Sequence, residues 1–306
     1  MRAAVLGIFS FPRWLSGRQR YSCFFLFSIL CLALFCVPLG RLWELALHDR
    51  GSSHTILIPL LSGFLIYWRR KEIFATPRYC VLRAVPVFLL AAACYGIGQA
   101  SSLSPSARLT LWITGVVLAW SAGFLLFFGS SSFRAAGFPL LLLLLMIPWP
   151  EFITHDVTVT LQHASADMAY YLFKIAGIPV FWQDLKFSLP GVEIEIAEEC
   201  SGIRSSIALL ITSMLVGHLL LESTWKKVCF ALCAIPVAIL KNALRVVTLS
   251  GLGIYVDPGF LHGRLHQYGG LPFSMVAIAI LTPVFALLRR GETLAPAQSR
   301  YIEPRP

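Results

Sequence analysis

Charged residues are scarce in this 306-residue chain, at 13% of the sequence against the roughly 25% of an ordinary soluble domain. Hydrophobic residues make up 57%, and the mean hydropathy is +0.75. This scarcity of charge excludes an ordinary soluble domain and predicts a polytopic membrane protein. Internal repeats, low-complexity tracts and nucleotide-binding glycine motifs are lacking too, which leaves no sequence basis for a repeat protein or a nucleotide-dependent enzyme.

Cysteine patterns that indicate metal sites or disulfides are also missing. Six of the eight cysteines lie inside apolar runs, where we expect them to pack as small hydrophobic residues. No CxxC motif occurs, and His262 and His266 are four residues apart without an evident third ligand for a metal. The sequence therefore predicts neither a metal nor a cofactor, and it leaves Cys200 as the one cysteine in a polar, patterned neighbourhood.

Eight apolar runs are long enough, or nearly so, to cross a bilayer at about 20 residues each. They cover residues 21–39, 55–68, 81–97, 109–128, 138–149, 203–221, 228–252 and 271–288. The first run lacks a small-residue cleavage site and is read as a retained helix. We therefore predict an all-α polytopic membrane protein of about eight helices, in which residues 1–290 form a single transmembrane domain and residues 291–306 a short, disordered cytoplasmic tail.

The charge distribution predicts the orientation of these helices. With eight spans, one side of the membrane carries 16 basic and four acidic residues, which leaves nine basic and 11 acidic residues for the other side. By the positive-inside rule both termini lie in the cytoplasm. Since the cytoplasmic side carries a net +12 and the other side a net −2, the overall charge of +10 does not indicate a nucleic-acid partner.

The one sizeable connection between the runs is the extracytoplasmic insertion at residues 150–199. Its first half, residues 153–175, fits an amphipathic helix lying on the bilayer. Its second half predicts a β-hairpin, because the alternating runs 181–188 and 192–196 flank Leu189-Pro190-Gly191, which is strong turn chemistry. The second strand would deliver the chain to Cys200.

Cys200 stands just before the apolar run that begins at Ile203, so we expect it at or near a helix N-terminus close to the outer membrane surface. The helix dipole, and Arg204 one turn later, would stabilise a thiolate there, whereas Glu199 would oppose it. A hydroxyl, Ser201, comes directly after the thiol. A reactive Cys200 therefore requires cations from elsewhere in the chain.

Polar residues interrupt the seventh apolar run at Lys241, Asn242 and Arg245. A charge inside a span costs at least ~2.5–3.5 kcal/mol near its centre and usually marks function. Lys241 and Arg245 lie one helical turn apart, in the same leaflet as Cys200. Two interpretations remain open for these cations: they face a functional cavity, or they extend along the lipid to reach the outer phosphates.

The loop before the last run brings His262 and His266 to the same side of the membrane as Cys200 and Arg245. His54, which opens the second run, also falls on this side, although a helix cap is the simpler interpretation of the Ser52-Ser53-His54 stretch. A Cys, an Arg and a His that converge at one membrane depth would suit nucleophilic catalysis by a thiol.

These residues resemble the motifs of the exosortase/archaeosortase family of membrane-embedded cysteine transpeptidases. The resemblance rests on Cys200-Ser201-Gly202-Ile203, on Asn242-x-x-Arg245 and on His266 followed four residues later by Gly270. Three further stretches agree: Ser53-His54 before Pro59, Trp68-Arg69-Arg70, and the run from Phe138-Pro139 to Met146-Ile147-Pro148-Trp149-Pro150.

The resemblance implies an enzyme that recognises and cleaves a PEP-CTERM-like C-terminal sorting signal at the outer face of the inner membrane. Its partners would be exported proteins that end in a short motif, a transmembrane helix and a basic tail, together with membrane lipid and an acceptor pathway such as exopolysaccharide. The resemblance assigns Cys200 as nucleophile, Arg245 as the oxyanion-side cation and His266 as acid/base. His262, one turn from His266, remains an alternative histidine.

Two other classes of function stay open from the residues alone. A transporter would use Lys241 and Arg245 to bind an anionic substrate, typically between inverted repeats, which we do not detect. A non-catalytic assembly protein would need no thiol at residue 200.

Overall fold

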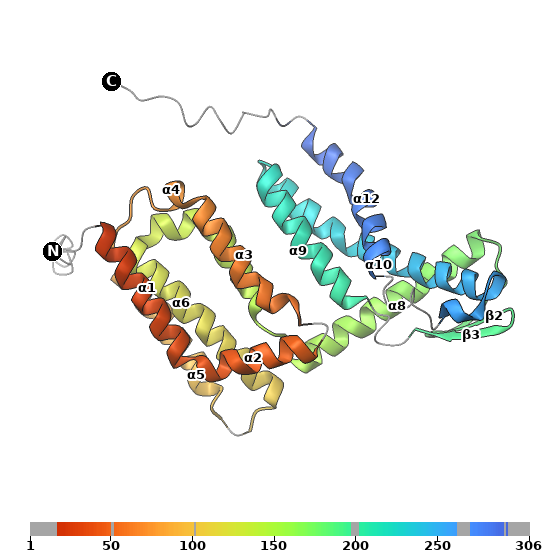
Figure 1. The fold of residues 1–306 in the computed structure, drawn as a ribbon, viewed down its shortest axis with the longest axis horizontal. Helices are drawn as coiled ribbons and strands as arrows, with labels where there is room; N and C mark the ends of the chain where they lie inside the picture. The colour runs from red at the N-terminus through yellow and green to blue at the C-terminus, as the bar shows by residue number, and fades with distance from the viewer. Residues whose placement is uncertain are drawn as a thin grey trace, which may run out of the picture. The chain divides into compact units, whose positions relative to one another are not determined.

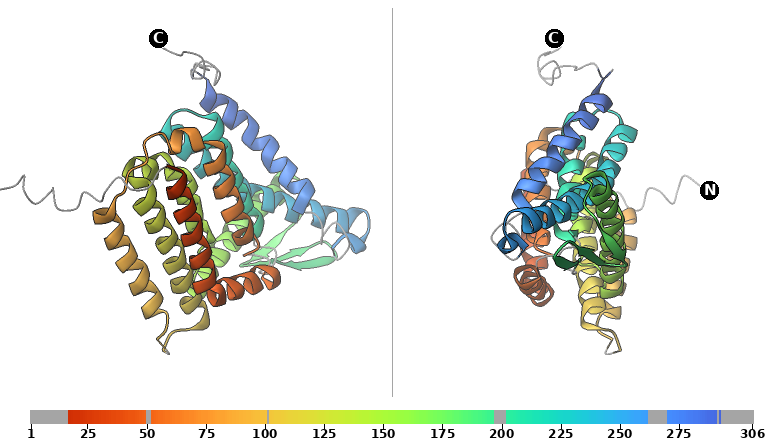
Figure 2. Two further views of the ribbon diagram at one scale, coloured as in Figure 1. Left: turned by 60° about the vertical axis from the view of Figure 1, so that its left-hand side comes forward. Right: turned by 90° about the vertical axis from the view of Figure 1, so that its right-hand side faces the viewer.

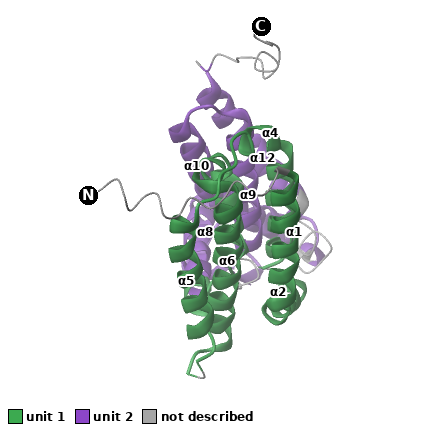
Figure 3. Cartoon of the chain, turned by 90° about the vertical axis from the view of Figure 1, so that its left-hand side faces the viewer, with its two compact units in different colours: residues 1–154 green, residues 155–306 purple. Residues whose placement is uncertain are grey.

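The computed structural model describes residues 17–49, 52–100, 102–196, 202–261, 270–290 and 292. These residues form two compact units, Met1–Thr154 and His155–Pro306 (Figure 3). The elements follow in the order α1 (Gly17–Leu34), α2 (Cys36–His48), α3 (His54–Trp68), α4 (Arg70–Ile73), α5 (Val81–Ile97), α6 (Pro105–Ala135), α7 (Gly137–Leu143), η2 (Leu144–Met146), α8 (Glu151–Ile175), β1 (Phe181–Gln183), β2 (Lys186–Leu189), β3 (Val192–Glu195), α9 (Ile203–Leu220), α10 (Thr224–Tyr255), η4 (Pro258–Leu261) and α12 (Gly270–Arg289) (Figure 1).

Helix α6 forms the centre of the first unit. It begins where the hydroxyl of Ser104 accepts a hydrogen bond from the N–H of Ala107 at 3.3 Å, with proline as its first residue. Its buried rings Phe124 and Phe128 contact Phe24 of α1, with centroids 5.8 and 5.0 Å apart. Helices α1 and α5 lie along α6, so this long apolar helix is a protein core rather than a lipid-facing surface.

Gly129 interrupts α6 with a φ of +81°. The segment before α5 crosses the helix there: the N–H of Arg78 donates to the carbonyl of Phe128 at 3.1 Å, and that of Cys80 to Leu126 at 3.2 Å. A side chain at residue 129 would place its Cβ 2.3 Å from the carbonyl oxygen of Arg78, so the close approach requires glycine. Helix α6 therefore continues beyond the predicted apolar run 109–128, and it is broken at Gly129, directly after that run.

The second unit contains a three-stranded antiparallel sheet in the order β1-β2-β3. Strands β2 and β3 form a hairpin in which Leu189 pairs with Val192, and Gly191 takes a φ of +78° in the turn. The expectation of one strand over residues 181–188 is wrong, because Asp184, with a φ of +60°, turns the chain between β1 and β2.

Helix α8 covers residues 151–175, so the helix expected at residues 153–175 is present, while its position on the bilayer stays a prediction. The sheet packs beside α8, as the views of Figure 2 also show. Phe173 of α8 and Phe187 of β2 are fully buried with ring centroids 5.7 Å apart. The amide of Gln162 on α8 donates to the carbonyl of Ile196 at 3.1 Å, which holds the chain that follows β3 against α8.

Helix α10 connects the parts of the second unit. Phe230 and Ala238 of α10 pack with Leu209 of α9 and with Ala277 and Leu281 of α12. Farther along, Ala243 of α10 is buried among side chains of α8 and the sheet. The strand that leads towards Cys200 and the helix that carries Arg245 thus belong to one packed unit.

The molecule is a helical membrane protein. Within the described residues, four helices are long and apolar enough to cross a membrane, namely α6, α9, α10 and residues 272–289 of α12. The number rises to six if the bent pairs α1–α2 and α7–α8 each count as one span. The shorter apolar helices α3 and α5 would complete eight, so the count of eight and the orientation remain predictions.

The cysteines within the described ranges are free thiols. Cys31 is buried, whereas Cys36, the first residue of α2, is exposed.

Candidate active site

Hydrogen bonds concentrate on the carbonyl of Gly202 at the start of α9. Gly202 is the N-cap residue and takes a left-handed conformation with a φ of +73°. Its carbonyl oxygen accepts from the hydroxyls of Ser205 and Ser206 and from the N–H of Ser206, each at 2.9 Å. These bonds hold the first turn of α9 on its N-cap residue.

Two buried polar side chains of α10 pack against this turn. Lys241 is 3% exposed, and its ammonium donates a hydrogen bond to the hydroxyl of Ser205. Asn242 is 2% exposed and lies against Gly202, where an added Cβ would stand 3.0 Å from the side-chain oxygen Oδ1 of Asn242. The interpretation that Lys241 extends along lipid to the outer phosphates is therefore wrong, because its ammonium is inside the protein.

Arg245 lies one turn after Lys241 on α10 and is half-buried, whereas Arg204 in the first turn of α9 is exposed. The positive end of the α9 dipole lies near Lys241, which stands midway along α10, and Arg245 follows Lys241 one turn later. A helix N-terminus together with nearby cations stabilises an anion, which in a reaction is a thiolate or a developing oxyanion.

The sequence of this site belongs to a known family. The sequence model of the transmembrane exosortases (Exosortase_EpsH) matches residues 43–282 of the 306. The chain belongs to the transmembrane exosortase family. Comparison of this exosortase with curated proteins and with solved structures gives no match. Membership indicates a membrane protein that sorts exported proteins by transpeptidation, in agreement with its apolar helices.

Several predicted site residues of this exosortase lie outside the described residues. They are Glu199, Cys200, Ser201, His262 and His266. The convergence of Cys200, Arg245 and His266 therefore stays a prediction. What the structure does bring together is Gly202 and Ser205 from α9 with Lys241 and Asn242 from α10.

His54 is the first residue of α3 and belongs to the first unit of the exosortase, whereas α9 and α10 belong to the second. The capping interpretation of this stretch is wrong for Ser53, the N-cap residue of α3, which makes no capping hydrogen bond through its side chain. Instead, Thr55 in the first turn donates from its hydroxyl to the carbonyl of Ser52 at 2.8 Å.

Sequence reasoning missed Ser205 as a member of the site. Its signal was present in the spacing, since Ser205 and Ser206 stand three and four residues after Gly202, where serine hydroxyls reach back to a carbonyl one turn earlier. The partner of Ser205 was not evident, because Lys241 is 36 residues away along the chain.

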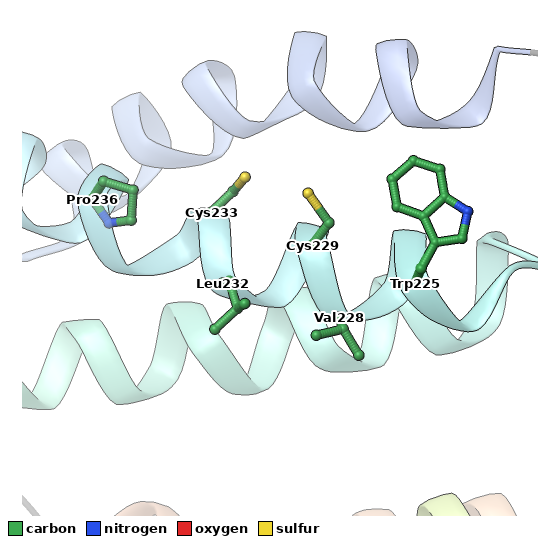
Figure 4. Close-up of a pocket in the computed structure, with 6 residues that line it drawn as sticks. All are labelled: Trp225, Val228, Cys229, Leu232, Cys233 and Pro236. Carbon is green, nitrogen blue, oxygen red and sulfur yellow. The ribbon is translucent and has the colours of Figure 1, made fainter.

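An apolar groove of about 510 Å³ lies on α10 at a distance from these polar residues along the helix (Figure 4). Its lining consists of Trp225, Val228, Cys229, Leu232, Cys233 and Pro236. It offers no charged group that a reaction could use. Among the residues that the structure describes, no three His, Cys, Asp or Glu side chains are grouped to hold a metal ion.

Proposed function

We propose that this exosortase is a cysteine-dependent transpeptidase that cleaves a PEP-CTERM-like C-terminal sorting signal on exported proteins. The family match over residues 43–282 carries the proposal, since it includes Cys200, Arg245 and His266. The supporting observation from the fold is the polar set of half-buried Ser205 with buried Lys241 and Asn242, in which Ser205 stands five residues after Cys200 in the chain.

In the proposed reaction, the thiolate of Cys200 attacks the carbonyl carbon of the scissile peptide bond. Negative charge then develops on the carbonyl oxygen, and the guanidinium of Arg245 donates hydrogen bonds to it. His266 gives a proton to the leaving amine as the C–N bond breaks, which leaves the substrate bound to Cys200 as a thioester.

The second half of the reaction releases the substrate. An acceptor nucleophile, which is water, an amine or a lipid, loses its proton to His266 and attacks the thioester carbon, and Cys200 leaves as a thiolate. A histidine with a reference pKa near 6.5 can serve as acid in the first half and as base in the second.

The substrate's own transmembrane helix explains why the site would sit at a membrane surface. A protein anchored by one helix carries its cleavage motif at a constant depth, so encounter with the enzyme is confined to two dimensions and much of the positioning is provided by the membrane. We propose the outer face of the inner membrane for this site and the cytoplasm for both termini.

The test is processing of a tailed substrate by full-length enzyme in membranes. Cys200→Ala and Cys200→Ser should abolish processing at normal protein level, while the matched control Cys233→Ala on α10 should process like the unaltered enzyme. Intact mass of the unaltered enzyme should reveal a substrate adduct on Cys200 that hydroxylamine removes. Processing by Cys200→Ala would overturn the proposal in favour of transport or assembly of an anionic substrate.

A further inference from the structure

Two buried N–H donors near the start of α6 lack a hydrogen-bond partner among the residues that the structure describes. They are Nε of Arg108 and Nε1 of Trp112. Trp112 is only 6% exposed, so its donor is shielded from the solvent around the protein. Buried donors are usually paired, because an unpaired one has lost its hydration without gaining a bond. The surroundings of these two donors therefore indicate what pairs with them.

The two donors are neighbours on one face of α6. Arg108 and Trp112 are one helical turn apart, so their side chains stand next to each other. Arg41 of α2 adds a second guanidinium, whose Cζ lies 5.2 Å from the centre of a Trp112 ring. A guanidinium at this distance is attracted to the face of an indole, which holds Arg41 beside the donors. Side chains from two helices thus meet at Trp112.

The end of α5 lies against the same indole. Gly98, the C-cap residue of α5, packs so close to Trp112 that an added Cβ would stand 2.7 Å from Cδ1 and 2.9 Å from Nε1. The carbonyls of Cys94 and Ile97 at this helix end already accept backbone N–H groups, each at 3.0 Å. The end of α5 therefore brings a glycine, and no hydrogen bond, to the indole N–H, and a side chain at residue 98 would block the approach to it.

The charge around this indole is positive. In the described part of the chain, the ion pairs involve neither Arg41 nor Arg108. Glu44, three residues after Arg41 on α2, is exposed and forms none of these ion pairs either. Arg108 is the fourth residue of α6, so the positive end of the helix dipole adds to the two guanidiniums. The group is therefore suited to an anion that carries more than one negative charge.

We propose that Arg41, Arg108 and Trp112 form a binding site for a phosphate monoester. Such a group carries a charge of about −1.5 to −2 at pH 7, which matches two guanidiniums. Its three terminal oxygens accept several hydrogen bonds at once, so both arginines donate to it and the indole N–H pairs with one oxygen. Arg41 is exposed and Arg108 half-buried, so a ligand reaches both from the surface.

The site does not depend on the proposed sorting reaction. Its residues belong to the first unit of the chain, whereas α9 and α10 belong to the second. The orientation predicted from the charges places the start of α6 at the extracytoplasmic surface, where a phosphate monoester comes from a lipid headgroup or from solution. Phosphatidic acid and glycerol 3-phosphate carry the same phosphate with and without acyl chains, so together they distinguish the two sources.

The test measures thermal unfolding of the purified full-length protein in detergent micelles against the concentration of each probe, which gives an apparent Kd. A lipid ligand predicts stabilisation by phosphatidic acid alone, and a soluble ligand predicts stabilisation by glycerol 3-phosphate as well. Trp112→Phe removes the N–H and should weaken binding of the active probe roughly fivefold, while Arg41→Gln and Arg108→Gln should each weaken it at least about tenfold.

Trp120→Phe is the matched control, since it is the same change two turns farther along α6. The indole N–H of Trp120 donates to the hydroxyl of Ser28 at 3.1 Å, so this variant should lose stability but keep the affinity of the unaltered protein. Trp112→Phe should show the opposite pattern, because the donor that it removes is unpaired. Diacylglycerol, which has the chains without the phosphate, should not stabilise the protein.

Three results would overturn the phosphate site. They are stabilisation by diacylglycerol equal to that by phosphatidic acid, equal probe affinity in the unaltered protein and in the Arg41, Arg108 and Trp112 variants, and no stabilisation by any probe. In each case water, and not a phosphate, would be the partner of the two buried donors.

Discussion

At the scale of single residues, the polar groups of α10 set this protein apart from an ordinary bundle of apolar helices. Lys241 and Asn242 are almost fully buried, and Arg245 is half-buried one turn later. Residues of this kind are costly inside a membrane and generally mark a site of function. The three lie within a stretch of five residues of one helix, and Asn242 among them packs against Gly202.

Arg245 should be poorly replaced by lysine. The planar guanidinium offers several N–H donors in a fixed geometry, whereas an ammonium is a point charge on a flexible stem. We expect Arg245→Lys to slow substrate processing by about 10²–10³, as loss of one oxyanion donor does. The measurement is the initial rate in membranes at matched protein level, with Arg290→Lys as the control. A rate like that of the unaltered enzyme would remove Arg245 from the site.

Gly202 should tolerate alanine less well than Gly191. Both residues are left-handed, with φ of +73° and +78°, so alanine costs about 1–2 kcal/mol at either position. An added Cβ meets Asn242 at residue 202 and nothing within 4 Å at residue 191. Thermal unfolding in detergent should therefore show the larger loss of stability for Gly202→Ala.

The substitution Asn242→Ala serves as the control for this comparison. With the amide removed, the extra cost of Gly202→Ala over Gly191→Ala should shrink, because the contact at 3.0 Å no longer exists. Equal losses for both glycines in the unaltered background would show that packing against α10 does not hold the turn.

At the scale of elements, the ends of α9, α10 and α12 are joined by one carboxylate. Glu292, which follows α12, accepts from the N–H groups of Glu222 at 3.0 Å and Ser223 at 3.2 Å. Its oxygen Oε1 also lies 3.3 Å from the ammonium of Lys226. Glu222 and Ser223 stand in the connection between α9 and α10, and Lys226 lies in the first turn of α10, so the carboxylate ties the end of α12 to this junction.

This junction should open in acid. The hydrogen bonds from Glu222 and Ser223 and the charge of Lys226 lower the pKa of Glu292 below its usual value. A lowered pKa means that the junction contributes stability above the pKa of the unfolded chain, near 4.3, and loses it as pH falls through the lower folded value. Amide exchange at Glu222 and Ser223, corrected for the intrinsic rate, should show protection that falls below about pH 4.

The substitution Glu292→Gln removes the titration but keeps one acceptor oxygen. Protection at these two amides should then be weaker at neutral pH and independent of pH across the acid range. If the unaltered protein keeps full protection down to about pH 2, the carboxylate is not what holds this junction together.

At the scale of the whole molecule, the distribution of charge and apolar residues makes the chain an integral membrane protein. In the part of the chain that the structure describes, four helices meet the length and composition of a span, and the number of spans rises to six if each bent pair counts as one. The sheet β1-β2-β3 and helix α8 form a compact part of the second unit, and α10 joins it to the apolar helices.

The predicted orientation places the turn at Pro190-Gly191 outside the cytoplasm and both termini inside. Alkaline phosphatase, which is active only after export, should therefore be active when inserted at this turn and inactive when fused after residue 306. A cytoplasmic reporter such as green fluorescent protein should give the reverse pattern. Activity of a phosphatase fused at the C-terminus would refute the orientation and the extracytoplasmic site that follows from it.

Much of the architecture follows from local sequence patterns. The amphipathic run at residues 153–175 predicts most of the helix that covers residues 151–175, and Pro-Gly between alternating residues predicts the turn at Gly191. The division of the first strand was not visible, since it depends on Asp184 adopting a positive φ, which aspartate tolerates but does not require. The break at Gly129 likewise depends on a carbonyl of Arg78, about 50 residues earlier.

Family, membrane class and the positions of the candidate residues were determined by the sequence itself, because hydropathy, charge and short motifs are properties of neighbouring residues. The tertiary structure alone decided that Lys241 is buried on Ser205 and that Asn242 closes on Gly202. Those pairings depend on how α9 and α10 pack side by side. A periodic apolar pattern specifies which face of a helix is buried, but it does not specify which residue of the neighbouring helix contacts that face.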